Sequence, residues 1–216
     1  MAIQFHTIYV PHDMNKPEIL PVRGRPREFC VDGALARALG VFWSKGYEGT
    51  SLNDLTEAME ITRPSLYAAF GNKESLFRKA LDLYEREKLA YIRKALEQPS
   101  AREVAEVMLR GAVDNVSTRD GPHGCMGVIT SVACGAESQS VREEVVKRGE
   151  DGKQALAERF RRAKAEGDLP PHVDPEGLMR VLIAMLQGIS VQASQGATRE
   201  ELDRLVEAGL ALWPST

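Results

Sequence analysis

The sequence predicts an all-α protein of about nine helices. Helix-forming residues such as Ala, Leu, Glu and Arg are plentiful, whereas aromatic residues make up 6% of the chain. Apolar residues recur at helical spacing between the Gly and Pro breaks. Ser, Thr, Asn or Asp stands before many of these periodic segments, where a helix N-cap is expected.

Composition limits the functional classes. The chain has 216 residues, 43% of them apolar, which suits one or two domains with a sizeable core. Its net charge of −3 argues against nucleic-acid binding by the whole surface. Residues 23–80, however, hold nine Lys/Arg and seven Asp/Glu, and thus a small positive excess. A basic head on an acidic body is compatible with a DNA-binding module attached to a domain that does not contact DNA.

The stretch from Ser51 to Leu76 predicts three helix starts with very short connections. Ser51 with Asp54 forms a capping-box pattern before the first of these helices. Thr62 caps a second helix, Arg63–Ala69, whose first turn holds Pro64. Asn72 caps a third, which begins at Lys73. Two helices of about two turns joined by a short turn are typical of a helix-turn-helix unit, which places its second helix in a DNA major groove.

This stretch and its upstream flank resemble the DNA-binding domain of the TetR family of bacterial transcriptional regulators. The matching segments are GRPRE at 24–28, ALARALGVFW at 34–43, GYEGTSLNDLTEAM at 46–59 and ITRPSLYAAFGNKESLF at 61–77. The turn between the two short helices usually holds Gly in this family, and here it holds Glu60. A left-handed conformation at Glu60 would cost about 1 kcal/mol.

The residues themselves favour several DNA contacts. Arg63 at the start of the reading helix can reach a guanine edge, and Pro64 and Ser65 beside it can meet a thymine methyl, a neighbouring base or a phosphate. Arg23 and Arg25, separated by Gly, can lie in a narrow minor groove.

The resemblance implies the same reading helix. It places base contacts at Arg63, Pro64 and Ser65, and phosphate contacts at Tyr67 and Lys73. Lys73 also lies beside a helix N-terminus, which favours an anion. Thr50 and Ser51 at the start of the preceding helix are further expected phosphate contacts.

The other helices are predicted from caps and breaks. The first runs over Asp32–Lys45, the next begins at Lys73 and reaches Glu97, and a third is opened by the Ser100–Glu103 capping box. His123–Cys134 forms another, followed by a charged helix that Ser138 caps and Gly167 ends. The last two helices run from Pro175 to about Gln195 and from a cap formed by Thr198 and Glu201. We expect three regions: residues 1–22 as a disordered extension, 23–84 as the DNA-binding domain, and 85–216 as a ligand-binding and dimerisation domain.

The last two helices are expected to form a homodimer. Leu178, Leu182, Met185, Ile189 and Gln192 follow a spacing of four and three residues, which suits packing against a partner helix. Dimerisation through the last two helices is also what the resemblance implies. Two heads related by a two-fold axis predict a near-palindromic double-stranded operator.

A small-molecule effector is the second expected partner, since the second domain of the resembled family usually encloses an inducer. The residues that we expect at an adaptable apolar cavity are Met108, Cys125, Met126, Met185, Gln187 and Gln192. Cys125 follows a His and lies near a predicted helix N-terminus, which lowers a thiol pKa. A thiol-based regulator that senses redox state or electrophiles is therefore an alternative.

Other classes find less support in the sequence. We find no phosphate-binding glycine loop, zinc-type His/Cys spacing or nucleophile elbow, so we expect no enzyme activity, metal or cofactor. No apolar run approaches about 18 residues and no signal-peptide pattern is evident, so we expect a cytoplasmic protein without a membrane contact. The sequence leaves open whether Met1 or Met14 is the start.

The leading hypothesis is therefore a dimeric DNA-binding transcriptional regulator, a repressor that a small-molecule effector releases from its operator. A small α-helical enzyme is one rival, and it would need a catalytic constellation. An interaction adaptor that keeps the helix-turn-helix only for packing is the other, and the expected exposure of Arg63, Tyr67 and Lys73 speaks against it.

Overall fold

The computed structural model describes residues 29–117, 124–133 and 138–214. Within these ranges the chain forms ten α-helices and no strand. They are α1 (Val31–Gly49), α2 (Leu52–Met59), α3 (Arg63–Phe70), α4 (Lys73–Lys88), α5 (Ala90–Leu96), α6 (Ala101–Val116), α7 (Met126–Ala133), α8 (Gln139–Ala165), α9 (Pro175–Ser194) and α10 (Arg199–Ala211). The expected extension, residues 1–22, lies outside the described residues. The predicted all-α fold is confirmed.

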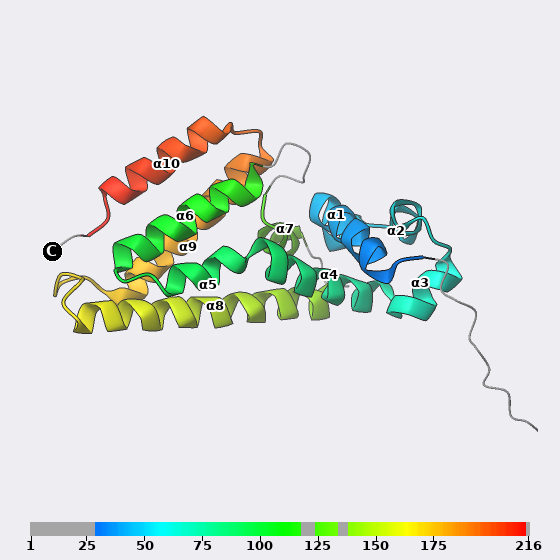
Figure 1. The fold of residues 1–216 in the computed structure, drawn as a ribbon, viewed down its shortest axis with the longest axis horizontal. Coiled ribbons are helices and arrows are strands. Elements are labelled where there is room, and N and C mark those ends of the chain that lie inside the picture. Colours follow the sequence, from blue (N-terminus) through cyan, green and yellow to red (C-terminus); the bar gives the residue numbers. More distant parts are fainter. Residues whose placement is uncertain (1–28, 118–123, 134–137, 215–216) are drawn as a thin grey trace, which may run out of the picture.

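The molecule is elongated (Figure 1). Helices α1–α3 form a head at one end, and α4 leads from the head toward α5. Helices α5, α6, α8, α9 and α10 form the body, and α7 lies between the body and α1. The long helix α8 runs beneath both α5 and part of α4. Helix α3 thus lies at the end of the molecule far from α9 and α10.

The head is built around an aromatic core. Phe42 of α1 is fully buried and meets Phe77 of α4 edge to face, with 5.2 Å between the ring centroids. Leu55 of α2 and Leu66 of α3 are also fully buried in this core. The core continues beyond the head, because it includes Met126 of α7 and two residues of α8, Val141 and Val145.

The body has its own core, formed by α5, α6, α8, α9 and α10. Leu109 of α6, Phe160 of α8, Leu182 of α9 and Val206 of α10 have no exposed surface. Phe160 also contacts Trp213, with 5.8 Å between the ring centroids. The second domain is therefore a helical bundle in which α9 and α10 already pack against the same chain. The exact division at residues 84 and 85 stays a prediction.

The N-caps follow the sequence closely. Reciprocal capping boxes occur at Ser51–Asp54, Ser100–Glu103 and Thr198–Glu201. The side chains of Thr62, Asn72 and Asp174 also accept backbone hydrogen bonds at the starts of α3, α4 and α9. Since these bonds satisfy N–H groups that the helix leaves free, they fix where each helix begins.

Three predicted boundaries were wrong. The helix expected from Lys73 to Glu97 is broken at Leu89 (φ −102°, ψ 10°) into α4 and α5. The helix expected from His123 begins at Met126, and Cys134 lies outside the described residues. Ser138 precedes α8 but makes no capping hydrogen bond with its side chain. The first helix keeps its expected interruption at Gly46 (φ 70°), although the element continues to Gly49.

The dimer seam predicted on α9 was wrong at three of its five positions. Leu178, Leu182 and Ile189 are buried in the core of their own body. The length and apolar composition of α9 alone would suit a membrane span. Of this apolar stretch 33% is buried, where α9 packs against α6, α8 and α10.

The turn between α2 and α3 holds Glu60 in the left-handed region, at φ 55° and ψ 42°. Among the described non-glycine residues it alone has a positive φ. Strain of about 1–2 kcal/mol is usual there. The Glu60 carboxylate lies 3.9 Å from Arg37, and both side chains are well exposed, so this ion pair offsets little of the strain.

We expect Glu60→Gly to stabilise the protein. Glycine removes the backbone strain, but it also gives the unfolded chain more conformational entropy. The net gain in the free energy of unfolding is about 0.5–1 kcal/mol. The midpoint of thermal unfolding should shift upward by about 1–4 °C. Glu57→Gly is the matched control, because Glu57 is an exposed residue within α2. This substitution should lower stability by about 1 kcal/mol. A fall in stability with Glu60→Gly would contradict the strain at this turn.

Candidate nucleic-acid interface and ligand cavity

Helix α3 is attached by one face and offers the other to solvent. Leu66 and Phe70 are buried beneath it, whereas Arg63, Pro64 and Tyr67 are exposed. Tyr67 keeps 48% of its surface exposed, which is high for so large a ring. Ser65 is half-buried, and its backbone N–H is 3.3 Å from the Thr62 hydroxyl that caps the helix. The helix therefore presents an outward surface of the kind that a DNA groove requires.

Arg63 is held in place by the neighbouring helix. Its Nη2 donates a hydrogen bond of 2.7 Å to Oδ1 of Asn53 on α2. The guanidinium has further N–H groups, which remain geometrically suited to two acceptors on a guanine edge. The bond to Asn53 orients the side chain in advance, so less conformational entropy is lost when Arg63 binds a base.

Lys73 occupies the first position of α4. Its Nζ lies 4.4 Å from the centroid of the Tyr47 ring, and the residue is half-buried. The stem of the side chain is thus positioned at a helix N-terminus, where the helix dipole favours an anion. A phosphate beside α4 would meet both the ammonium and the positive end of that dipole.

Ser51 is exposed but already bonded. Its hydroxyl accepts a bond of 3.1 Å from the Asp54 N–H and donates one of 2.7 Å to the Asp54 carboxylate. The bond from Lys45 Nζ to Asp54, at 2.5 Å, and the bonds from Ser51 hold the pKa of Asp54 well below its usual range. The pKa of this carboxyl is lower in the folded protein than in the unfolded chain. The stability that the Asp54 carboxylate adds to the α2 cap is therefore complete above pH about 4 and declines only as the pH falls further.

One of the expected DNA contacts, Thr50, is buried, and two others lie outside the described residues. Thr50 is 1% exposed, and its hydroxyl donates a bond of 2.6 Å to the Gly46 carbonyl. Its side chain therefore closes the kink of α1 instead of facing solvent, which corrects the expectation of a phosphate contact. Arg23 and Arg25 lie outside the described residues.

A cavity of about 320 Å³ lies in the body next to the head. Most of its wall is apolar, and α4, α6, α7, α8 and α9 all contribute. Its residues are Leu81, Tyr84, Glu85, Leu89, Tyr91, Ile92, Met108, Ala112, Asn115, Val116, Cys125, Gly127, Val128, Val146, Arg148, Gly149, Gly152, Lys153, Ile183, Leu186, Gln187, Ile189 and Ser190. The volume is within the range of sites for small organic ligands.

The sequence placed half of the expected cavity residues correctly. Met108, Cys125 and Gln187 line the cavity. Met126 is instead fully buried in the core that the head shares with α7 and α8. Met185 packs in the body core toward Gly209 of α10. Gln192 is exposed and lies outside the cavity wall.

The polar end of the cavity was not predicted. The Tyr84 hydroxyl donates to Cys125 Sγ at 3.5 Å and accepts from Asn115 Nδ2 at 3.3 Å. The Cys125 N–H in turn donates to the Ser190 hydroxyl at 2.6 Å. Burial raises the pKa of Tyr84 strongly, so the phenol stays neutral. These four residues come from four separate segments of the chain, so no local spacing marks them as a group.

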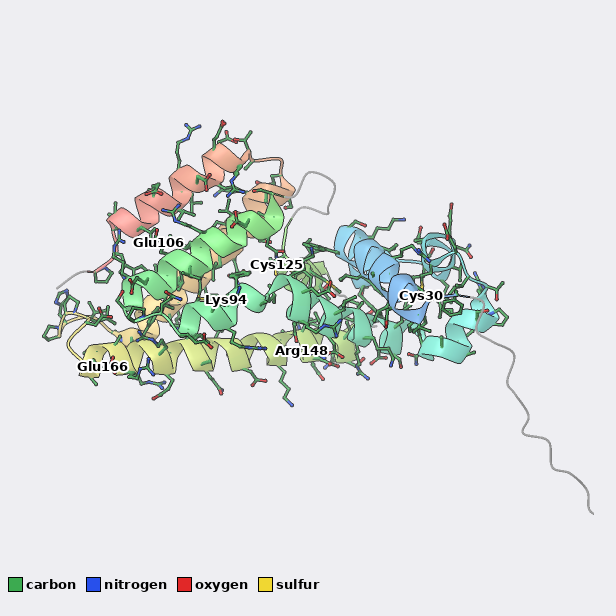
Figure 2. The ribbon with its side chains drawn as sticks, viewed as in Figure 1. Cys30, Lys94, Glu106, Cys125, Arg148 and Glu166 are labelled. Atoms are coloured by element: carbon green, nitrogen blue, oxygen red, sulfur yellow. The ribbon has the colours of Figure 1, made fainter. Side chains whose placement is uncertain are left out.

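Arg148 of α8 ties the cavity rim to α4. Its guanidinium lies 2.7 Å from Asp82, 3.0 Å from Glu85 and 2.6 Å from Glu144. Figure 2 labels Arg148 on α8. Arg78 of α4 adds a second bond across this contact, at 2.6 Å from Glu144. Ion pairs beside the cavity thus connect α8 to α4, the helix that follows the head in the chain.

Two family models match the chain. The first, "Bacterial regulatory proteins, tetR family", matches residues 34–80, and the second, "Tetracyclin repressor-like, C-terminal domain", matches residues 101–208. The first match covers α2, α3 and most of α1, with the start of α4. The second spans the body from α6 into α10.

Relatives agree over nearly the whole length. The HTH-type transcriptional repressor ComR of Escherichia coli (strain K12) is 35% identical over 194 residues, or 89% of this chain and 92% of ComR. The uncharacterized HTH-type transcriptional regulator YezE of Bacillus subtilis (strain 168) is 28% identical over 191 residues, or 88% and 98% of the two chains.

A solved structure extends this likeness. It contains a cysteine mutant of the TetR family transcriptional regulator CifR complexed with a 26 bp double-strand operator DNA. This chain is 44% identical to CifR, with a TM-score of 0.83 over 88% of this chain and all of the other. The protein therefore belongs to the TetR family of bacterial transcriptional regulators.

Proposed function

We propose that this protein is a dimeric repressor that binds a near-palindromic operator and leaves it when a small molecule occupies the body cavity. The observation that carries the proposal is the outward face of α3, where Arg63, Pro64 and Tyr67 are exposed at the end of the molecule. Chromosomal DNA is the corresponding partner, so the protein would act in the cytoplasm.

The DNA contacts divide into two kinds. Arg63, Pro64 and Ser65 would meet base edges from the first turn of α3, and these contacts would set the sequence preference. Tyr67, Lys73 and Ser51 would contact phosphates, and these contacts would fix the position of the head on the duplex. The operator complex of CifR supports this docking, since the two chains share the fold over nearly their full length.

The dimer would form through exposed stripes of α9 and α10. On α9, Val181 is 54% exposed and Val191 is 44% exposed, and Ala184 and Gly188 lie between them at helical spacing. Leu212, the residue directly after α10, is 85% exposed. Exposed large apolar side chains on α9 and at the end of α10 suit a four-helix interface between two copies.

The apolar cavity supports the effector part of the proposal. Successive major grooves on one side of a duplex lie about 34–36 Å apart. A ligand needs only to favour a state of the dimer in which the distance between the two heads does not match this spacing. A difference of about 1–3 kcal/mol between the two states is usual for such coupling. The thiol-based alternative would rest on Cys125 alone, which is half-buried and bonded to Tyr84.

Arg63→Ala tests the reading function. The duplex for this test is selected from a random pool by repeated binding to the wild-type protein, and a scrambled duplex serves as its partner. We expect the variant to lose about tenfold or more of its preference for the selected duplex, because a bidentate contact to guanine discriminates by about 1–3 kcal/mol. Gel-shift titrations of both duplexes measure this ratio.

The control is Arg93→Ala, which removes the same charge from exposed α5, outside the head. It should keep the preference of the wild-type protein. An unchanged preference in Arg63→Ala would remove Arg63 from the base contacts. Failure of the wild-type protein to select any duplex would refute the repressor proposal.

A further inference from the structure

The cavity is kept open by residues that are unusual inside helices. Gly127 of α7 and Gly149 and Gly152 of α8 all line it. A side-chain carbon added at Gly149 or Gly152 would meet no atom within 4 Å, and at Gly127 it would make only ordinary contacts. Gly149 and Gly152 are exposed residues of the cavity wall, so close packing does not explain them. Glycine within a helix is less stable than alanine by roughly 0.5–1 kcal/mol, and the missing side chains leave this side of the cavity open.

The groups that face this space favour an uncharged molecule. Its apolar wall includes Ile92, Met108 and Leu186, and its polar end includes the neutral phenol of Tyr84 and the amide of Asn115. The polar end can therefore form a hydrogen bond with one polar group of a bound molecule. An ion would instead lose its hydration in this apolar site, and that loss disfavours its binding.

The charged residues at the rim are already paired. Arg148 bonds to Asp82, Glu85 and Glu144, and Lys153 Nζ lies 2.7 Å from Glu150. Arg148, Lys153 and Glu85 are the ionisable Arg, Lys and carboxylate side chains of the cavity wall. An anionic or cationic ligand would thus have to compete with an existing ion pair.

The polar end of the cavity also contacts the head. The Trp43 indole of α1 donates a hydrogen bond of 2.7 Å to the carbonyl of Gly124, the residue before Cys125. The Trp43 and Tyr84 rings meet edge to face, with 4.9 Å between their centroids. Trp43 is 4% exposed and belongs to the core of the head. A molecule that moves Tyr84 or Cys125 therefore acts on α1 directly.

We propose that the cavity binds an uncharged, mainly apolar molecule with one hydrogen-bonding group, and that Trp43 transmits its presence to the head. The inference rests on the proposed function for its biological meaning, but both of its parts are measurable without DNA. The ligand class follows from the neutral polar end and the paired rim. The route follows from the two contacts of Trp43 with Tyr84 and Gly124.

The first test compares two fluorescent probes with one aromatic skeleton. N-phenyl-1-naphthylamine is uncharged, and 8-anilinonaphthalene-1-sulfonate adds a sulfonate to the same rings. We expect the full chain to bind the uncharged probe at about one per chain, and about tenfold or more tightly than the sulfonate, because the charge would have to be buried. Equal or tighter binding of the sulfonate would overturn the ligand class.

Filling the cavity locates the probe. The double substitution Gly149→Leu and Gly152→Leu should weaken binding of the uncharged probe at least about tenfold, because the leucines occupy its space. Gly40→Leu on α1 is the matched control, since an added carbon there also has no atom within 4 Å and Gly40 is not on the cavity wall. Binding that survives the double substitution would place the probe elsewhere and overturn the site.

Amide hydrogen exchange tests the route. Binding of the uncharged probe should change exchange rates in α2 and α3 of the wild-type protein. In Trp43→Phe, which lacks the indole N–H, the probe should still bind but the change in α2 and α3 should be largely lost. A change of the same size in this variant would overturn the role of Trp43. Failure to bind an operator would count against the repressor proposal alone, because neither measurement contains DNA.

Discussion

A protein that carries both Val181→Glu and Val191→Glu should be monomeric and should lose about 100-fold or more of its operator affinity. The two carboxylates would lie in the exposed stripe of α9 and would repel their counterparts in a second copy. The loss in DNA binding follows because a dimer gains affinity when its second head binds from a high effective concentration. Analytical ultracentrifugation and gel-shift titration measure the two effects.

Ala155→Glu is the matched control. Ala155 is exposed on α8 and is not among the residues of the cavity wall. This control should remain dimeric and should bind the operator as the wild-type protein does. Circular dichroism should show the same helix content in all three proteins, because both substituted α9 residues are exposed. A dimer that persists in the double variant would place the interface elsewhere.

Lys73→Gln should weaken binding to every duplex, selected or scrambled, by a similar factor. Each protomer would lose one phosphate contact, and a dimer would therefore lose two. The slope of log affinity against log salt concentration should become shallower by about 2, since each neutralised phosphate contributes about 0.9. Glutamine keeps much of the aliphatic stem near Tyr47, so the change removes the charge with little loss of packing.

Lys94→Gln is the control for the charge itself. Lys94 is exposed on α5, in the body and away from α3 (Figure 2). Its loss should leave the salt slope unchanged within error. If Lys73→Gln and Lys94→Gln gave the same slope, the contact of Lys73 with a phosphate would be refuted, and only the net charge of the protein would matter.

The sequence predicted the head better than the body because the head is specified locally. Ser51, Thr62 and Asn72 each cap a helix through the residue three positions later, and such pairs are visible in a linear sequence. The left-handed conformation of Glu60 was anticipated from the family resemblance, because this turn usually holds Gly in the family. Contacts of this range need no knowledge of the rest of the fold.

The body depends on contacts that a single helix does not reveal. The spacing of Leu182 and Ile189 marks an apolar face of α9, but the same pattern serves a core of the same chain or a partner chain. The adjacent Val181 and Val191 are the ones left exposed. The break at Leu89 has no Gly or Pro to announce it, so helical periodicity alone predicted one continuous helix.

The cavity shows the same limit. Its polar end unites Tyr84, Asn115, Cys125 and Ser190, which span more than 100 positions of the chain. Met108 and Cys125 were found because their residue types suggest adaptable surfaces, but the same reasoning chose Met126, which is a core residue. Residue type therefore suggests candidates for such a site, and only the packing of separate helices selects among them.

The core of the head takes Met126, Val141 and Val145 from α7 and α8. A fragment cut after Tyr84 would therefore lack three of its interior side chains and would carry an uncovered apolar surface. Grafting this head onto another regulator would require the matching parts of α7 and α8 as well. The folding unit that carries the head is therefore discontinuous in the chain. Any movement of α7 or α8 beside the cavity would also move side chains in the core of the head.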